Sequence, residues 1–141
     1  MSSTMLSGKA ECFMKDKDHS AYMLQTGEKD FTALKSMQDV ESFADEIFGF
    51  HAQQSVEKFL KAWISYLGDE YPLIHDLSVL LSKLESLGCE VNDQWDFVEL
   101  NAFAVQFRYE SFDSCDEPLD RQEVIKKIQR LFDKVNSLIN R

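Results

Sequence analysis

Hydrophobic residues recur at intervals of three and four along most of the chain, which is the period of an amphipathic α-helix. The clearest case is the stretch 42–67, where the hydrophobic side chains fall within one arc about 120° wide. Gly68 predicts the end of this helix and Pro72 prevents its continuation. The hydrophobic arc holds Phe48, Ala52, Val56, Phe59, Leu60, Trp63 and Leu67, and the opposite polar side holds His51, Gln54, Lys58 and Lys61.

The same pattern predicts four further helices. The fourth helix in chain order is hydrophobic on two sides, which indicates a place in the middle of a bundle or in a subunit interface. The last helix has a heptad-like seam of Val124, Ile128, Leu131, Val135 and Leu138. Together these elements predict an all-α fold, an up-and-down antiparallel bundle of four long helices plus one shorter helix. The four further helices are expected at 17–39, 75–87, 92–110 and 118–139.

Composition supports this fold class. A chain of 141 residues is long enough for one domain with a real core, and its 5 glycines and 2 prolines provide few turns for a β-rich domain. The first residues are small and polar. We therefore expect a flexible N-terminal arm at 1–15 and a single helical bundle domain at 16–141.

The charge balance limits the partners. The 15 lysines and arginines against 25 aspartates and glutamates give a net charge of −10, which disfavours general binding of nucleic acids. The 3 cysteines are too far apart for a metal or redox motif, so we expect reduced thiols. No signal peptide or membrane-spanning run stands out, and a cytoplasmic location is the expectation.

Motifs for metals and cofactors are missing from the sequence. It contains no HExxH pattern and no glycine-rich phosphate loop. The spacing of Asp16 and His19 would suit a metal, but ligand clusters need more convergent groups than these two. We therefore expect no metal and no cofactor.

Four polar residues attract attention on physical grounds. Arg108 ends a strongly hydrophobic helix, where an arginine must reach solvent or be held by partners, and its planar fork suits phosphate or carboxylate. Tyr109 beside it could stack on a base. His51 lies on the polar side of the second helix, where a solvated residue is the simplest interpretation. His75 stands at a helix start, where a capping role is the simplest interpretation.

These residues, in this order, match a known pattern. The sequence resembles the HEPN domain family over about 28–139. The resemblance rests on Asp30-Phe31, on Phe50-His51-Ala52-Gln53-Gln54 with Glu57-Lys58 and Lys61, on His75-Asp76-Leu77, and on Arg108-Tyr109.

The resemblance implies a bundle of about five helices that forms a homodimer with a site near the dimer cleft. Many HEPN proteins pair with a minimal nucleotidyltransferase, often as a toxin–antitoxin couple. Others are metal-independent ribonucleases in which an arginine is followed four to six residues later by a histidine. Here the three corresponding positions hold Asp113, Ser114 and Cys115, and none of these replaces imidazole as a proton carrier near neutral pH.

Three hypotheses follow from these observations. The first is a dimeric binding module that accompanies a nucleotidyltransferase or binds a nucleotide-like ligand, with no catalytic residue assigned. The second is a ribonuclease that uses Arg108 with a substitute for the missing histidine. The third is a purely structural interaction protein. The candidate ligand-binding residues are Arg108, Tyr109, His51, Gln54 and Lys58.

Overall fold

The computed structural model describes residues 2–104 and 119–140, with side chains described from residue 17 onward. The described residues form five helices and no strands, which confirms the all-α fold. The helices are α1 (Ser2–Lys35), α2 (Asp45–Tyr66), α3 (Leu77–Ser86), the 3₁₀ helix η1 (Asn92–Phe103) and α4 (Arg121–Ile139).

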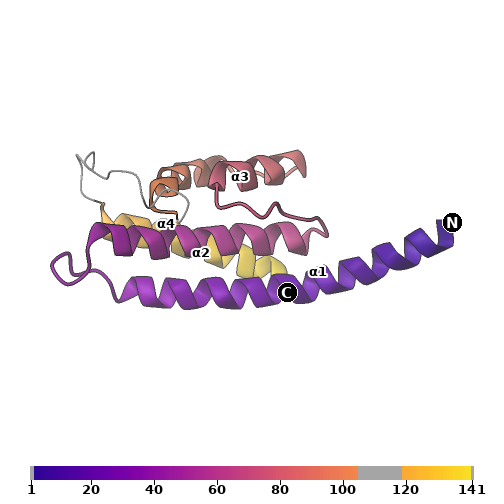
Figure 1. Ribbon diagram of the computed structural model, residues 1–141, viewed down its shortest axis with the longest axis horizontal. Helices are drawn as coiled ribbons and strands as arrows, with labels where there is room; N and C mark the ends of the chain where they lie inside the picture. The colour runs from indigo at the N-terminus through magenta and orange to yellow at the C-terminus, as the bar shows by residue number, and fades with distance from the viewer. Residues whose placement is uncertain (1, 105–118, 141) are drawn as a thin grey trace.

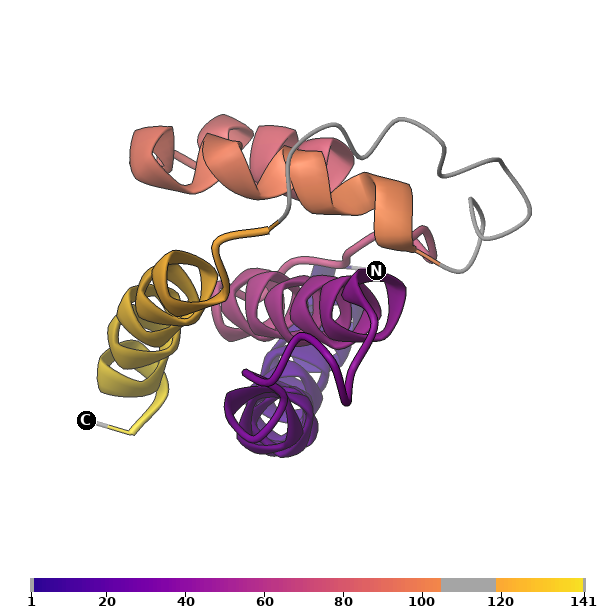
Figure 2. The ribbon, with the colours of Figure 1, turned by 90° about the vertical axis from the view of Figure 1, so that its left-hand side faces the viewer.

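Helix α2 lies at the centre of the molecule. Figures 1 and 2 show α1 running antiparallel along one side of α2, α4 lying beside both of them, and α3 with η1 covering the other side of α2. Its central place explains why α2 is buried on several faces rather than along a single arc. Its seven predicted core residues are buried, except Leu67 at its C-terminal end.

The ends of α2 and α3 follow from two glycines. Gly68 and Gly88 have φ angles of 79° and 86°, a conformation that is strained for residues with a Cβ atom. In both turns the glycine N–H and the N–H of the next residue donate to carbonyls of the last helical turn, as in a Schellman motif. The prediction that Gly68 ends a helix is confirmed, and Gly88 ends α3 in the same way.

Several helix bounds differ from the prediction. Helix α1 begins at Ser2, so the segment predicted as an arm, 1–15, is helical from residue 2 onward and projects beyond the bundle (Figure 1). Its flexibility stays a prediction. Helix α4 begins at Arg121 rather than at 118, because the Asp120 carboxylate accepts a hydrogen bond from the backbone N–H of Glu123 and caps the helix.

The predicted α-helix at 92–110 is wrong in type. The described part of this segment is a 3₁₀ helix that ends at Phe103, and 105–110 lie outside the described residues. A 3₁₀ helix has three residues per turn, so side chains spaced by three lie on one line. The two hydrophobic stripes seen in the sequence therefore come from a period of three. The buried line consists of Gln94, Phe97, Leu100 and Phe103.

Candidate functional site

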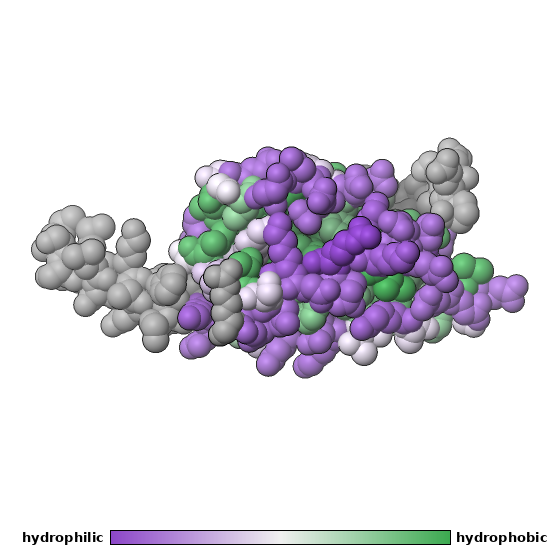
Figure 3. Space-filling view, turned by 180° about the vertical axis from the view of Figure 1, so that it is seen from behind, coloured by the Kyte–Doolittle hydropathy of each residue, from purple (hydrophilic) through white to green (hydrophobic). Residues whose placement is uncertain are grey.

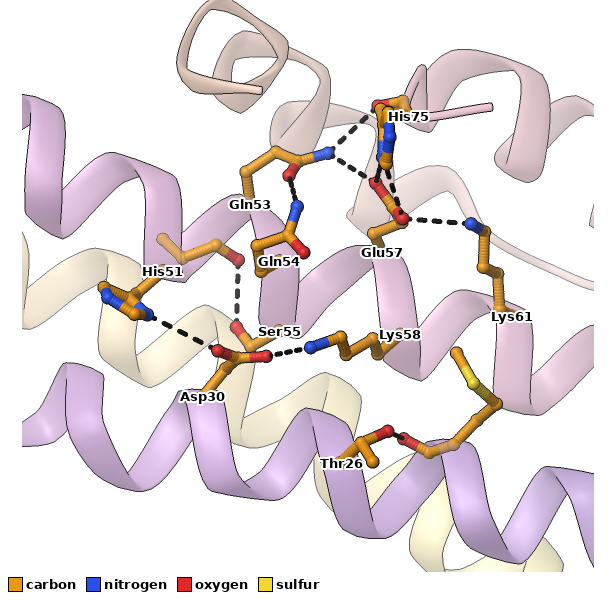
Figure 4. Close-up of polar contacts among 12 residues, drawn as sticks. Thr26, Asp30, His51, Gln53, Gln54, Ser55, Glu57, Lys58, Lys61 and His75 are labelled. Atoms are coloured by element: carbon orange, nitrogen blue, oxygen red, sulfur yellow. Dashed lines mark hydrogen bonds and ion pairs between the residues drawn. The ribbon is translucent and has the colours of Figure 1, made fainter. Parts of the chain in front are cut away.

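Helix α2 carries two clusters of polar residues on different faces. Gln53, Glu57 and Lys61 are spaced by four, so they form one row along the helix, and all three are buried. His51, Gln54 and Lys58 form a second row, which is only half-buried. We call the first group the buried network and the second the half-exposed row (Figure 4).

Glu57 is the centre of the buried network. One of its carboxylate oxygens accepts hydrogen bonds from Gln53 Nε2 at 3.0 Å and from His75 Nδ1 at 2.9 Å. The other accepts from Lys61 Nζ at 2.9 Å. Burial by itself raises the pKa of Glu57, but the hydrogen bonds from Gln53, Lys61 and His75 outweigh it and hold the pKa below its ordinary value. The carboxylate is therefore ionised at neutral pH.

The expectation that Lys61 belongs to a solvated polar side is wrong. Lys61 is 7% exposed and its charge is neutralised by Glu57. The reason is the central position of α2, which leaves this face covered by the chain that leads from α2 to α3. A buried ammonium is tolerated only with such a partner.

The His75-Asp76-Leu77 motif fastens α3 to this network. Gln53 Nε2 donates to the backbone oxygen of His75 at 2.9 Å, and the Asp76 carboxylate caps α3 by accepting from the N–H of Ser78 at 2.9 Å. The capping role expected of His75 thus belongs to Asp76. Asn101 of η1 completes the joint, because its amide donates to Asp76 and its oxygen accepts from the N–H of Leu77.

The half-exposed row is organised by Asp30 of α1. One carboxylate oxygen of Asp30 lies 3.4 Å from His51 Nδ1, and the other accepts a hydrogen bond from Lys58 Nζ at 2.5 Å. Gln54 Nε2 donates to Gln53 Oε1 at 2.8 Å, which joins the row to the buried network. Figure 4 shows Asp30 reaching from α1 to both partners. The structure therefore brings His51, Gln54 and Lys58 together on one face.

Arg108 and Tyr109 lie outside the described residues. Before them, the described chain ends beside α2. The ring of Phe103 packs so closely on Gly49 of α2 that a Cβ atom at this glycine would lie 2.4 Å from it. The described chain after them resumes at Leu119 and enters α4 at Arg121. Both flanks thus lead to the N-terminal part of α2, the part that also carries His51.

Arg121 is the principal residue that the sequence reasoning missed. Its side chain is 4% exposed and donates from Nη1 to the carbonyl of Met37 at 2.7 Å and from Nη2 to that of Phe43 at 2.6 Å. Nη2 also pairs with the Asp45 carboxylate at 2.8 Å. A signal was available, because a cation in the first turn of a helix opposes the helix dipole and needs partners elsewhere. Arg121 joins α4 to the turn between α1 and α2.

Metal-ligating groups do not gather in the described part of the chain. No group of three or more His, Cys, Asp or Glu side chains is placed there to hold a metal ion. Within the same residues, no helix is long and apolar enough to cross a membrane.

Comparison with known families gives one match. A family model for the HEPN domain matches residues 20–138, which covers the second half of α1 and the other described helices, apart from the last residue of α4. No curated protein and no solved structure matches the chain.

Proposed function

The chain belongs to the HEPN domain family of helical, nucleotide- or RNA-related modules, and we propose that it is a dimeric binding module for a nucleotide-like ligand. In this proposal the half-exposed row binds the ligand together with Arg108 and Tyr109. A minimal nucleotidyltransferase is the partner protein, and the pair acts as a toxin–antitoxin couple.

The observation that carries this proposal is the arrangement of His51, Gln54 and Lys58 around Asp30. Their shared face is accessible, with the side chains of His51 and Lys58 29% and 28% exposed. Lys58 has three N–H donors and Asp30 takes one of them, so two are available for a phosphate. Asp30 also orients the His51 ring through Nδ1, which leaves Nε2 for a ligand.

Charge favours a small ligand over a long nucleic acid. Within the row, the carboxylate of Asp30 neutralises the ammonium of Lys58, and the whole chain has a net charge of −10. A polyanion would meet repulsion along its length, whereas a mononucleotide meets only the local site. Arg108 adds the cation that makes the site attractive to a phosphate in this proposal.

Isothermal titration calorimetry with ATP tests the proposal. Wild-type protein should bind ATP, and Lys58→Ala and Arg108→Ala should each weaken binding about tenfold or more, because each removes a charge-assisted hydrogen bond. Lys127→Ala is the matched control, since Lys127 of α4 forms a surface ion pair with Asp96 of η1 at 3.2 Å. Equal binding by Lys58→Ala and Lys127→Ala would contradict the assignment of this face.

One observation also favours the ribonuclease alternative. His51 has a carboxylate behind Nδ1, as a histidine that moves a proton often has, so His51 could replace the histidine missing after Arg108. This activity would cleave RNA in the presence of EDTA and would be lost in both His51→Ala and Arg108→Ala. If purified protein leaves RNA intact under these conditions, the alternative is rejected.

A further inference from the structure

An open cavity lies at the C-terminal end of α2, beyond the half-exposed row. Its volume is about 220 Å³, and α1, α2 and the α2–α3 loop all contribute to its walls. Figure 3 shows hydrophobic side chains at the surface near the end of the bundle from which α1 projects. The cavity is lined by His19, Ser65, Asp69, Glu70, Tyr71 and Leu73.

The floor of the cavity holds a polar group with no partner. Ser65 is 3% exposed, yet its hydroxyl makes no hydrogen bond to any residue of the described chain. Other helical serines behave differently: Ser55, for example, donates to the carbonyl of Ala52 at 2.9 Å. The hydroxyl of Ser65 lies at the wall of the cavity with its donor and acceptor sites available, so a ligand group or a water can bind there.

One wall of the cavity is an aromatic group held in place from several sides. The ring of His19 lies beside those of Tyr22 and Tyr71, with ring centroids 6.2 and 5.7 Å apart, and its Nε2 forms a hydrogen bond with the Tyr71 hydroxyl. Lys61 Nζ lies 5.1 Å from the centre of the Tyr71 ring, with its charge neutralised by Glu57. The wall is therefore preorganised, which lowers the entropy lost on binding.

The rim of the cavity combines hydrophobic surface with negative charge. Leu73 is 94% exposed although its loop is fastened by the buried network, and Tyr22 is 61% exposed. Asp69 is paired with Lys83 at 3.3 Å, while the carboxylate of the exposed Glu70 has no partner in the described chain. Exposed apolar side chains on a rigid loop are typical of protein-binding surfaces.

We propose that this cavity is a docking site for an arginine side chain of a partner protein, with an apolar residue next to that arginine packing on Leu73. The guanidinium would pair with Glu70 and donate to the Ser65 hydroxyl, and it would contact the Tyr71 ring away from the face that Lys61 occupies. The carboxylate of Glu70 at the rim attracts such a segment and repels phosphate groups from this site. The site is separate from the half-exposed row, because Ser65 lies seven residues, about 10 Å, further along α2 than Lys58.

The test is an NMR titration of the full chain with the dipeptide acetyl-Leu-Arg-amide. We expect saturable shifts of the amide signals of Ser65, Glu70 and Leu73, with a Kd of about 1–10 mM for so small a probe. Acetyl-Leu-citrulline-amide has nearly the same shape without the charge and should bind about tenfold more weakly. Glu70→Gln and Leu73→Ser should each weaken the arginine probe. Glu41→Gln, in the exposed turn between α1 and α2, is the matched control and should not weaken it.

Three results would overturn the proposal. No shift at about 50 mM probe would mean that water alone occupies the cavity. Equal binding of the arginine and citrulline probes would show that the positive charge, and therefore its pairing with Glu70, does not contribute to binding. Shifts of the same signals by AMP but not by the arginine probe would make this an anion site. Since neither Lys58 nor Arg108 takes part, each result is independent of ATP binding at the half-exposed row.

Discussion

Glu57 and Asp30 are both carboxylates that hold cations of α2, but their burial gives them different roles. Glu57 is 4% exposed and its partner Lys61 is 7% exposed, so neither charge can turn to water if the other is removed. Asp30 and Lys58 keep 17% and 28% of their side chains exposed. At the residue scale, the buried pair therefore specifies the fold and the half-exposed pair is available for binding.

Glu57→Gln should lower the free energy of unfolding by about 3–5 kcal/mol, because it leaves the buried ammonium of Lys61 without a counter-charge. Asp30→Asn should cost about 1 kcal/mol or less, since Lys58 can then be solvated. Urea denaturation measures both. The double variant with Glu57→Gln and Lys61→Met should recover much of the loss. Equal effects of the two single variants would contradict the distinction.

The pH dependence of stability should follow the lowered pKa of Glu57. A carboxyl group whose pKa is lower in the folded state stabilises the fold above its unfolded pKa, here near 4.5, and loses that contribution as the pH falls through the folded value. We expect the free energy of unfolding to be insensitive to Glu57 above about pH 5.5 and to fall below pH 4.5. Denaturation series at several pH values should show a shallower acid loss in the Glu57→Gln/Lys61→Met variant than in wild type.

At the scale of elements, the sequence predicts α2 and α3 well because their hydrophobic spacing and end signals agree, whereas for α4 it predicts the hydrophobic seam but not the start. Asp76 and Gly88 bracket α3, and Asp120 sets the start of α4. The hydrophobic residues of η1 recur just as regularly, but with a period of three. When these residues are placed on an α-helix, at 100° per residue, they fall into two stripes. In the structure Leu100 and Phe103 belong to the buried core, and the ring of Phe103 packs on Gly49 of α2.

The contact between η1 and α2 depends on Gly49. A methyl group at this position would lie 2.4–2.6 Å from the ring of Phe103, too close for an aromatic ring packed in the core. Gly49→Ala should therefore lower the free energy of unfolding by about 1–3 kcal/mol, even though alanine favours helix more than glycine by about 1 kcal/mol. Thermal unfolding measures the loss. Phe103→Leu in the same chain should restore part of it, and a more stable Gly49→Ala protein would rule out the close contact.

At the scale of the whole molecule, the all-α bundle could be predicted from hydrophobic spacing and the family from short motifs. The described helices confirm the first, and the family match over 20–138 confirms the second. The roles of the motif residues could not, because they depend on which helix is central. Helix α3 is attached to α2 through Gln53, Glu57 and His75. The accessible residues are His51, Gln54 and Lys58. The place of Arg121 in a helix's first turn indicates that it needs partners, but the sequence does not show which ones, because Met37, Phe43 and Asp45 are distant along the chain.

A homodimer also belongs to this scale and stays a prediction. The resemblance to HEPN proteins places a site near a dimer cleft, so the half-exposed row should approach its copy in the partner subunit. Light scattering of purified protein at micromolar concentration should give twice the mass of the 16.3 kDa chain. A mass of one chain would remove the dimer from the proposal without affecting the buried network.

The central claim is that the half-exposed row of α2 binds a nucleotide, and NMR mapping with ATP tests it most directly. The account predicts saturable shifts centred on His51, Gln54 and Lys58, extending to Arg108 and reduced in Lys58→Ala. The groove between η1 and α4, which is lined by Lys127 and Arg130 among others, is the built-in comparison, because it also offers cations. Shifts centred on that groove, or no shifts at millimolar ATP, would contradict the account.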